Sequence, residues 1–464
     1  MMTTDPADAL FKKLEQEFLF SKEKLAPIIA GFVNGYRQGL KTPSKGLATM
    51  IPSFVTKLPH GSEKGTFLSL DLGGTNLRIS AVELMGAGQV QVLELKRSPS
   101  QELKTGSAEA FFDWIADAVQ ELINVKARHL FSEEQVLGRE TLSLGVCWSF
   151  PVDQTAVNKG TILRMGKGFT LKGIEGKDLA DMFHQAFDRK GLNIKVTAIL
   201  NDTVGTLVAH AYSNPKARIG LIFATGINAA YPEKVSAIEK LPQAVRDAYP
   251  ADTEMLINTE IDIFGDESYL PLTAYDLALD ANHNQPKFQQ YEKMMSGAYL
   301  GELVRLVSLD FIKTGALFEG IVPEGWEQPW SFPTSYMSAI ESESASVSHA
   351  KSLEVLSNFN FVNTPTLQDM VILTRICRIV ATRSAYLASV AIASMIEQQG
   401  LDRGNDDIVV GITGSTYEYY PHMADRLRRA LQEWFGPNIA NRIKLEIAKD
   451  GGSIGGALIA MLCC

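Results

Sequence analysis

The chain has 464 residues, of which 45% are apolar and 21% are charged, and its formal net charge is −9. This length exceeds what one ordinary hydrophobic core can organise, so we expect a globular protein of two or three domains. The negative charge argues against a nucleic-acid-binding surface.

The N-terminal half of the chain is predicted to alternate helices and strands. Residues 5–40 have the pattern of one or two helices, and we expect Pro27 to open the second of them. Alternating apolar residues then predict a hairpin of strands within 67–96. Further along we expect a helix at 108–125, a strand at 142–148, a loop rich in Gly and Lys, a helix at 177–190 and a strand at 195–200.

The C-terminal half continues this alternation, which predicts an α/β fold. A helix is expected to start at Asn201-Asp202-Thr203 and to run through His210, and a strand at 219–225 ends in a glycine turn. Long helices are predicted at 287–314 and 365–398. The chain then closes with a strand-turn-helix unit from Ile408, a strand IKLEIAKD, a turn GGSIGG and a terminal helix.

The sequence gives no indication of export or of membrane insertion. No apolar run looks long enough to span a bilayer, and the N-terminus lacks the apolar core of a signal peptide. The four cysteines, at 147, 377, 463 and 464, have no metal-ligand spacing. Adjacent Cys463 and Cys464 fit a lipidation or redox site, but a solvent-exposed tail is the simpler interpretation. We therefore expect a cytoplasmic protein in a reducing compartment, with no membrane partner.

The segment 67–83, FLSLDLGGTNLRISAVE, places Asp71 near the end of a buried strand and before the turn Gly73-Gly74-Thr75-Asn76. Two glycines permit backbone torsions that a side chain forbids, and their bare amides can approach a phosphate. Thr75, Asn76 and Arg78 add donors, and a carboxylate at the mouth of such a turn can hold magnesium, directly or through water. An ordinary glycine hairpin fits the same spacing equally well. The turn is not a Walker loop, which needs GxxxxGK[ST] before a helix.

Similar strand-to-glycine turns occur at four places in the chain. They are Asp71-Leu-Gly-Gly-Thr, Ala224-Thr-Gly-Ile-Asn, Thr413-Gly-Ser-Thr and Asp450-Gly-Gly-Ser. The last two are expected to open helices, whose N-termini attract phosphate. One such turn is weak evidence, but four of them together favour a nucleotide site.

Acidic residues outside these turns predict a second half of the site. Asp202 follows Asn201 at a strand end, where it is either a helix cap or a functional carboxylate. Glu260 and Glu292 lie in separate polar segments, and such carboxylates with Asn, Ser and Lys suit a ligand with many hydroxyls, such as a sugar. Phosphoryl transfer needs a positioned hydroxyl, a carboxylate to take its proton, and donors with a metal on the phosphates.

From about residue 10 to its C-terminus the chain resembles the hexokinase family, in the form seen in fungi and other eukaryotes. The resemblance rests on motifs in order: LDLGGTNLR at 70–78, SFP at 149–151, KGF at 167–169, NDTVGT at 201–206, ATGINAAY at 224–231, NTE at 258–260, YEKMMSGAYLGELVR at 291–305 and DGGSIGGA at 450–457. It implies an α/β, actin-like ATPase (ribonuclease H-like) fold with two domains that close on a central cleft. The implied small domain takes residues 67–200 plus 450–464, and the large domain takes 1–66 plus 201–449.

The resemblance also implies residue roles. Asp202 would be the general base that takes the proton from the sugar 6-hydroxyl. The implied sugar ligands are Ser149, Phe150, Lys167, Asn201, Asn228, Glu260 and Glu292. The implied nucleotide residues are Asp71 near magnesium, Gly73, Gly74, Thr75, Asn76 and Arg78 at the first phosphate turn, Thr225 and Gly226 at the second, and Thr413, Gly414 and Ser415 at the adenosine side. The expected partners are a sugar, ATP and Mg²⁺, with no direct metal ligand assigned, and the protein is expected to be a monomer or a homodimer.

Several positions depart from the family pattern. Gly166 replaces a Thr, and Ile261-Asp262 replaces a Trp-Gly pair, so that volume and a polar contact are lost beside the expected sugar site. Ala224, Thr413 and Gly452 stand where Gly, Asp and Ser are usual. Three functions remain open: a kinase with a pocket widened for N-acetylglucosamine, an ordinary glucose or fructose hexokinase, and a non-catalytic regulator. We favour the first because of the changes at Gly166 and Ile261. Ala224 and the altered adenosine turn support the regulator, but the presence of the general base and of all the polar sugar ligands argues against it. Sugar-site motifs such as NDTVGT disfavour an actin-like or chaperone-like ATPase.

Overall fold

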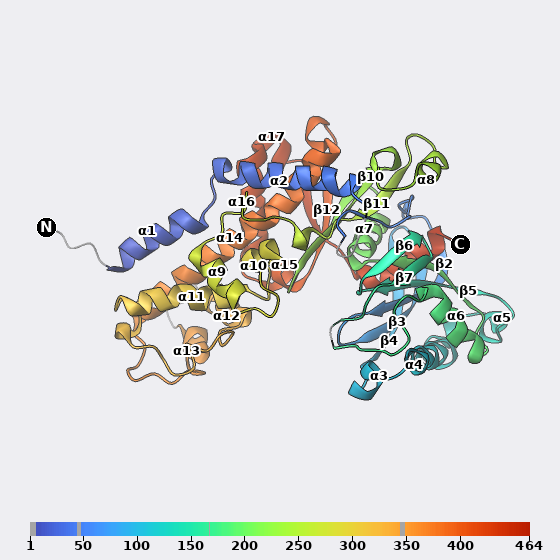
Figure 1. Ribbon diagram of the computed structural model, residues 1–464, viewed down its shortest axis with the longest axis horizontal. Coiled ribbons are helices and arrows are strands. Elements are labelled where there is room, and N and C mark those ends of the chain that lie inside the picture. Colours follow the sequence, from blue (N-terminus) through green and yellow to red (C-terminus); the bar gives the residue numbers. More distant parts are fainter. Residues whose placement is uncertain (1–5, 44–47, 167, 344–348) are drawn as a thin grey trace.

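The computed structural model of the protein describes residues 6–43, 48–166, 168–343 and 349–464. Its architecture is α/β, as predicted, and it contains a five-stranded and a six-stranded sheet. Figure 1 shows an elongated molecule in which the five-stranded sheet lies towards one end and the N-terminal helix at the other. We call the two halves of the molecule the five-stranded lobe and the six-stranded lobe.

The five-stranded sheet has the strand order β4-β3-β2-β5-β8. Its strands are β2 (Lys64–Leu72), β3 (Leu77–Gly86), β4 (Gln89–Arg97), β5 (Leu142–Trp148) and β8 (Ile194–Leu200). β2, β3 and β4 are antiparallel, and β5 and β8 run parallel to β2. The nearly continuous apolar sequence of β5 fits this position, because a central strand is covered on both faces.

The helices and minor elements of the five-stranded lobe follow its strands. They are α3 (Gln101–Thr105), α4 (Ala108–Glu121), α5 (Glu133–Val136), α6 (Leu179–Arg189), the short helices η1 (Leu122–Lys126) and η2 (Arg128–Leu130), and the hairpin β6 (Val152–Ala156) with β7 (Lys159–Ile162). One face of the sheet shares an apolar core with α4 and α6. The helix α18 (Gly456–Leu462), at the end of the chain, packs on β2 and β5 at the opposite face of the sheet.

The six-stranded sheet has the order β1-β11-β10-β9-β12-β13. Its strands are β1 (Ile51–Pro52), β9 (Ala217–Phe223), β10 (Ile227–Lys234), β11 (Glu254–Asn258), β12 (Ile408–Thr413) and β13 (Ile443–Ile447). β9, β10 and β11 form an antiparallel meander, and β12 and β13 run parallel to β9. The carboxyl ends of β9 and β12 therefore lie side by side, which brings the turns at 224–226 and 413–415 together.

Most of the helices accompany the six-stranded sheet. They are α1 (Pro6–Phe18), α2 (Lys22–Lys41), α8 (Gln243–Asp247), α9 (Ala274–Ala281), α10 (Gln290–Met295), α11 (Leu300–Lys313), α12 (Thr334–Ser342), α13 (Ala350–Leu356), α14 (Leu367–Gln399), α15 (Ser415–Tyr419), α16 (Met423–Phe435) and α17 (Pro437–Ala440), with the short helices η3 (Val235–Ala237), η4 (Ile261–Ile263), η5 (Phe318–Gly320) and η6 (Leu401–Arg403). The main apolar core joins these helices to the sheet.

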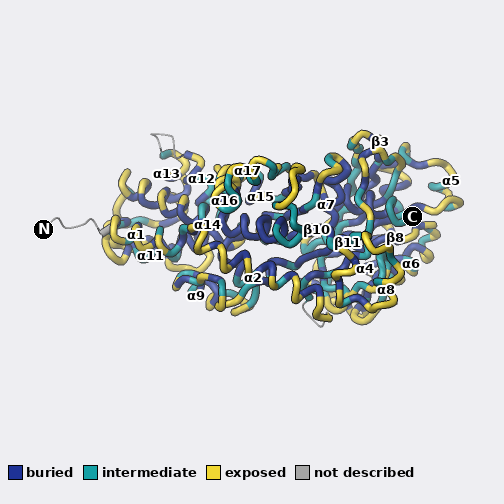
Figure 2. The backbone as a smooth tube through the Cα atoms, turned by 90° about the horizontal axis from the view of Figure 1, so that it is seen from above, coloured by how far each residue is buried: buried dark blue, intermediate teal, exposed yellow. Residues whose placement is uncertain are grey.

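The helix α14 is the central buried helix of the six-stranded lobe. It packs against α2, α11 and α16, and Figure 2 shows it as a buried element. By length and composition α14 could cross a membrane, so the expectation that no apolar run is long enough is wrong. However, 94% of its most apolar window is buried inside the protein, as in the core helix of a globular domain. Its apolar sequence is thus explained by packing.

The helix α7 (Asp202–Ser213) lies between the two sheets and is buried from Thr203 to Tyr212. It packs against β9 of one sheet and against the π-helical turn η7 (Gly451–Gly455) that precedes α18. The contact with η7 is made by glycines. A Cβ on Gly205 would overlap the carbonyl of Gly451, and a Cβ on Gly455 would overlap the carbonyl of Gly205. The two backbones therefore approach more closely than side chains would allow.

Two helix predictions are wrong in detail. Pro27 lies inside α2 rather than at its start, because Ser21 is the N-cap and Glu23 lies in the first turn. The expected helix at 287–314 is interrupted between α10 and α11. At this break the amides of Gly297 and Ala298 donate to the carbonyls of Ala224 (2.8 Å) and Thr225 (3.0 Å), which attaches the chain to the turn after β9.

The four cysteines are free thiols, and Cys147 and Cys377 are buried. Of the terminal pair expected to form an exposed tail, only Cys464 is exposed. Cys463 is half-buried, and burial raises its pKa to about 11. A thiol with such a pKa is a weak nucleophile at neutral pH.

Candidate active site

The start of α7 carries the residue predicted as general base. Asn201, and not Asp202, is the N-cap: its Oδ1 accepts from the amide of Thr203 at 2.9 Å and from the hydroxyl of Thr203 at 2.5 Å. Asp202 is the first helical residue. The alternative in which Asp202 is the helix cap is therefore wrong, and its carboxylate lies at the positive end of the helix.

A chain of amide hydrogen bonds connects the start of α7 with the end of β11. Asn258 lies at its centre: its Oδ1 accepts from Asn228 Nδ2 at 2.9 Å, and its own Nδ2 donates to Glu260 Oε1 at 2.6 Å. The hydroxyl of Thr203 also points to Asn258 Oδ1, at 3.4 Å. The structure therefore brings together Asn201, Asn228 and Glu260, which the sequence predicted as sugar ligands. Asn258 was part of a quoted motif but was not predicted as a site residue.

Glu260 and Glu292 lie near each other in this cluster, and Asp262 joins them. Burial, followed by the charge of Asp262, raises the pKa of Glu260 well above its usual range, and the charges of Asp202 and Glu292 add to this effect. The same two leading causes, burial and Asp262, raise the pKa of Glu292 to about 7. These four carboxyl groups thus share one poorly solvated space.

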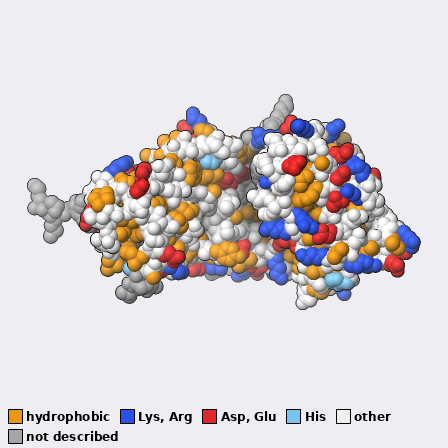
Figure 3. All heavy atoms as spheres, turned by 90° about the horizontal axis from the view of Figure 1, so that it is seen from below, with side chains coloured by type: hydrophobic (Ala, Val, Ile, Leu, Met, Phe, Trp, Pro, Cys, Tyr) orange, Lys and Arg blue, Asp and Glu red, His pale blue; other side chains and the backbone are white. Residues whose placement is uncertain are grey.

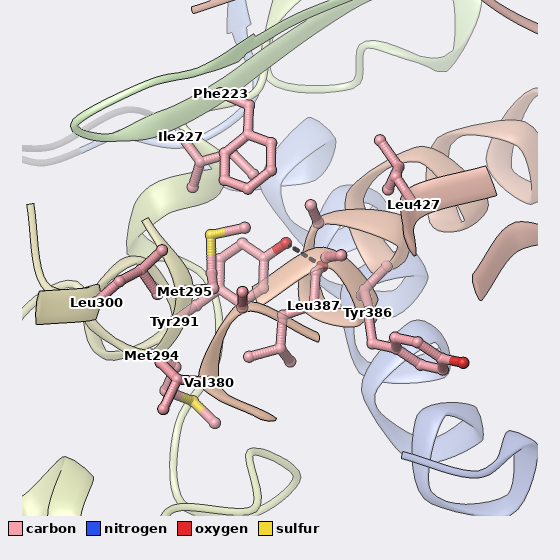
Figure 4. Close-up of a cluster of buried hydrophobic side chains, with 14 of the residues drawn as sticks. Phe223, Ile227, Tyr291, Met294, Met295, Leu300, Val380, Tyr386, Leu387 and Leu427 are labelled. Atoms are coloured by element: carbon pink, nitrogen blue, oxygen red, sulfur yellow. Dashed lines mark hydrogen bonds between the residues drawn. The ribbon is translucent and has the colours of Figure 1, made fainter. Parts of the chain in front are cut away.

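Glu292 is held in place by the turn after β9. Its Oε2 accepts from the amide of Ile227 at 2.9 Å. A Cβ on Gly226 would come within 2.5 Å of the same oxygen, so glycine is needed here for the approach of Glu292. Behind it, Tyr291 is buried and donates its hydroxyl to the carbonyl of Leu387 in α14 at 2.7 Å (Figure 4). The core therefore fixes the short helix that presents Glu292.

A second carboxylate cluster lies at the end of β2. Asp71 pairs across the hairpin with Arg78, and across the parallel ladder with Cys147. Burial raises the pKa of Asp71 to about 6, the charges of Asp202 and Asp450 raise it further, and the guanidinium of Arg78 offsets part of this rise. Gly452 is close to Asp71, since a Cβ there would lie 2.9 Å from Asp71 Oδ2. The Ser that is usual at this position would not fit without a shift.

The turn at 73–76 is a hairpin turn, and its first amide is already used. Gly73 donates its amide to the carbonyl of Asn76 at 3.1 Å. Gly73 also has a backbone conformation that other residues adopt, so its glycine is not needed for unusual torsions, contrary to expectation. Thr75 and Asn76 contact each other through their side chains, at 2.9 Å. Sequence reasoning missed Lys104, whose Nζ donates to the carbonyl of Gly74 at 3.2 Å and adds positive charge to the turn.

The turns at 224–226 and 413–415 meet, as the strand order requires. The hydroxyl of Thr416 donates to the carbonyl of Ala224 at 2.7 Å, and a Cβ on Gly414 would lie 2.9 Å from the Cβ of Ala224. The amide of Gly414 donates to Glu418 Oε1 at 2.7 Å, and the hydroxyl of Thr413 points to the same oxygen at 3.2 Å. Ser415 is exposed and begins α15. A carboxylate thus occupies the donors of this turn.

The remaining predicted sugar ligands lie on the loop after β5. Ser149 is partly exposed, and its amide donates to the carbonyl of Leu72 at 3.3 Å. Phe150 points into the core, where its ring contacts those of Trp148 and Phe169, so its side chain supports the loop. Gly166 borders open space, since a Cβ there would meet nothing within 4 Å. Lys167 lies outside the described residues.

The replacement of Trp by Ile261 does not open the site as expected. Ile261 is fully buried in the main apolar core, and its amide points to Asn228 Oδ1 at 3.3 Å. Its neighbour Asp262 is the greater change, because a carboxylate stands there in place of the family's glycine. Gln289 Nε2 donates to Asp262 Oδ2 at 2.6 Å, and neither residue was predicted as a site residue.

The carboxylates between the lobes suit a magnesium ion that is bound together with a nucleotide, although they do not form a complete metal site in the described part of the chain. Figure 3 shows the molecule hollowed between its two lobes. Among the described residues, no group of three or more His, Cys, Asp or Glu side chains is close enough to bind a metal alone. Magnesium usually takes one or two carboxylates together with substrate phosphates. The charges of Asp202 and Asp450 both raise the pKa of Asp71, so a divalent cation beside Asp71 would be favourable.

Comparisons with known proteins agree with this geometry. Two family models, both described as Hexokinase, match residues 10–212 and 218–462. Hexokinase-1 of Schizosaccharomyces pombe is 35% identical over 453 residues, which cover 97% of this chain and 90% of that protein. Glucokinase of Aspergillus niger is 32% identical over 477 residues, which cover 97% of this chain and 96% of that protein. The structure of a hexokinase from Schistosoma mansoni complexed with glucose has a TM-score of 0.79 and 32% identity, and covers 99% of this chain and 100% of its own.

Proposed function

The chain belongs to the hexokinase family and has its actin-like ATPase fold, and from this premise we propose that it is an ATP-dependent hexose kinase. The reaction transfers the γ-phosphoryl group of ATP to the 6-hydroxyl of the sugar. The hexokinases and the glucokinase with which the chain shares nearly its whole length support this activity.

One observation carries the proposal: the charge of Asp202 reaches both carboxylate clusters. It raises the pKa of Asp71, beside the first phosphate turn, and that of Glu260, in the sugar cluster. Asp202 therefore lies between the groups expected to hold the two substrates. A general base for phosphoryl transfer needs this position, where the acceptor hydroxyl meets the transferred group.

The proposed roles follow from the contacts. Glu260, Glu292, Asn201 and Asn228 would accept and donate hydrogen bonds to the sugar hydroxyls, with Ser149 and Lys167 approaching from the five-stranded lobe. Asp202 would take the proton of the sugar 6-hydroxyl while the sugar 6-oxygen bonds to the γ-phosphorus. At the same time the bond between the γ-phosphorus and the β-phosphate oxygen breaks, and ADP leaves. The protein's main contribution is then to position these groups and to provide complementary charge.

The nucleotide side is proposed from the turns. Thr75 and Asn76, with Lys104 close by, would contact phosphate, and the turns at 225–226 and 413–415 would border the rest of the nucleotide. Asp71 and Asp450 would hold magnesium, directly or through water, and the ion would neutralise phosphate charge. Arg78, opposite Asp71, would balance that carboxylate when no ion is bound.

We further propose that the lobes correspond to two domains, 67–200 plus 450–464 and 1–66 plus 201–449, which close on the sugar. The sugar ligands come from both, so the bound sugar favours the closed state by the additional contacts it makes there. A monomer or homodimer in the cytoplasm, without nucleic-acid or membrane partners, is the simplest setting for such an enzyme.

The preferred sugar is a finer question. Of the two replacements expected to widen the pocket for N-acetylglucosamine, Ile261 lies in the core and leaves Gly166 as the remaining support. Gly166 borders open space on the loop that carries Lys167. N-acetylglucosamine is thus a substrate to be tested beside glucose, fructose, mannose and glucosamine.

A non-catalytic sugar-binding protein is the second candidate. It is favoured by Glu418, whose carboxylate occupies the amide of Gly414, because a negative charge at this turn would repel a nucleotide. An ADP-release assay with the five sugars tests both candidates, with Asp202→Asn as the negative control. Turnover with any hexose that is lost in Asp202→Asn supports the kinase. Binding of a sugar by calorimetry, without turnover, would replace the kinase by the regulator.

A further inference from the structure

Asp262 is a buried carboxylate that the proposed catalytic roles do not use. It is 9% exposed and lies in η4, two residues after Glu260. Gln289 Nε2 donates to its Oδ2 at 2.6 Å, and the amides of Asp262 and Ile263 approach the carboxylate and partly offset the rise that burial gives its pKa. Its buried Oδ1 has no hydrogen bond of good geometry in the described part of the chain. A buried carboxylate oxygen left without a partner is costly, so it indicates a donor that the free protein lacks.

Among the described residues, no cation forms an ion pair with the carboxylates around Asp262. Its charge is the second cause, after burial, of the raised pKa of both Glu260 and Glu292, so it faces the same space as they do. Among the described residues, none of the three carboxylates forms an ion pair. Lys293, next to Glu292, pairs with Asp280 instead: its Nζ contacts Asp280 Oδ1 and the carbonyl of Gln285, each at 2.6 Å, and its charge offsets the raised pKa of Glu292 only in part.

We propose that Asp262, with Glu260 and Glu292, forms an ammonium subsite that gives this chain a preference for amino-hexoses over neutral hexoses. The inference rests on the proposed function, since it concerns the sugar that the same cleft receives. Asp262 would act as a specificity-determining residue through the positive charge of the sugar's amino group.

The chemistry of the two sugar classes explains the preference. A hydroxyl offers one proton to a carboxylate, whereas a protonated amine offers three N–H donors and a full positive charge. A neutral sugar leaves three adjacent carboxyl groups that can be accommodated only by retaining protons. An ammonium group allows them to ionise and gives the unpartnered Oδ1 of Asp262 a charged donor. Glu260 and Glu292 would suffice to bind the sugar hydroxyls. The additional carboxylate of Asp262 is accounted for if the ligand carries a positive charge.

The experiment compares kcat/KM for glucosamine, glucose and N-acetylglucosamine in the wild type, Asp262→Asn and Asp262→Gly. The neutral N-acetyl derivative separates the charge from the nitrogen substituent. We expect the glucosamine-to-glucose ratio to fall by about tenfold or more in both variants, since an interaction equal to one pKa unit changes an equilibrium tenfold. The N-acetylglucosamine-to-glucose ratio should change much less. Glu267→Gln is the matched control, because it removes one exposed carboxylate five residues along the chain.

Dissociation constants of the three sugars, measured by calorimetry, keep the test independent of turnover. If the wild type binds glucosamine more tightly than glucose but phosphorylates neither, the kinase proposal fails and the ammonium subsite stands. If both ratios stay unchanged in folded Asp262→Asn and Asp262→Gly, or if Glu267→Gln changes them equally, the subsite is refuted. A wild type that binds glucose more tightly than glucosamine refutes it as well, without any variant.

Discussion

Replacing Gly226 with alanine tests whether this glycine serves the sugar or the nucleotide. By resemblance, Gly226 belongs to a phosphate turn. In the structure, a Cβ at this position would come within 2.5 Å of Glu292 Oε2, the oxygen that accepts from the amide of Ile227 at 2.9 Å. Gly226 does not have a positive φ, so the added methyl group acts by contact alone. We therefore expect Gly226→Ala to displace the Glu292 carboxylate from its place.

The size of the effect follows from the hydrogen bond that is lost. A hydrogen bond to a charged group contributes about 1.5–3 kcal/mol. If that amount is withdrawn from sugar binding, the dissociation constant of the sugar rises by about tenfold to a hundredfold. The affinity for ATP should change little, because Glu292 is part of the sugar cluster.

Calorimetric titrations with sugar and with ATP separate the two roles, and kcat/KM for each substrate provides a second measurement. Gly404→Ala is a suitable control, since a Cβ there would make only ordinary contacts, at 3.8 Å, far along the chain in an exposed loop. An unchanged sugar affinity together with a weakened ATP affinity would show that Gly226 serves the phosphates, and our reasoning from Glu292 would be refuted.

Three further predictions concern the base, the buried carboxyl group and domain closure. Asp202→Ala should lower kcat by about 10²- to 10⁴-fold without lowering the melting temperature. Asn201→Ala, which removes the cap of α7, should reduce the free energy of unfolding by about 1 kcal/mol. Equal melting temperatures for the two variants would contradict this pair of predictions. Burial raises the pKa of Glu292 from 4.5 to about 7, so the folded state retains a proton that the unfolded state has lost, and the free energy of unfolding should fall by about 3 kcal/mol as the pH rises across this interval. Urea titrations at about pH 5 and about pH 8 should show a smaller fall in Glu292→Gln than in the wild type; an identical pH dependence would mean that Glu292 is not the group responsible. Small-angle scattering should give a smaller radius of gyration with saturating sugar than without it, and an unchanged radius would count against closure.

The sequence was most informative where local pattern and local chemistry coincide. The alternation of apolar residues in 67–72 and the apolar segment 142–148 predicted strands that the structure confirms as β2 and β5. The sequence predicted strand-to-glycine turns at 225 and 413, and the structure brings these two turns together because β9 and β12 are parallel neighbours. What a local pattern could not predict is the use of each glycine. The sequence cannot distinguish Gly226, which makes room for a carboxylate, from a glycine that exposes its amide.

The residues missed in the sugar cluster depend on contacts between distant segments. Asn258 and Asp262 lie in one short segment, but their partners Asn228 and Gln289 come from β10 and from the residue before α10, so the cluster appears only when these segments are placed together. Lys104 was missed for the same reason, because its partner Gly74 lies in another element. The break between α10 and α11 was also hidden, since the helical pattern of 287–314 continues through residues whose amides bond to the turn after β9.

The glycine contact between α7 and η7 has a consequence for the tolerance of this protein to mutation. In an ordinary core, loss of a large side chain is the damaging change, and neighbouring groups can partly refill the space. At Gly205, Gly451 and Gly455 the neighbour is backbone, which cannot withdraw, so the addition of one carbon is enough to separate the helix that carries Asp202 from the segment that follows Asp450. Saturation mutagenesis at these three positions should therefore recover glycine almost alone.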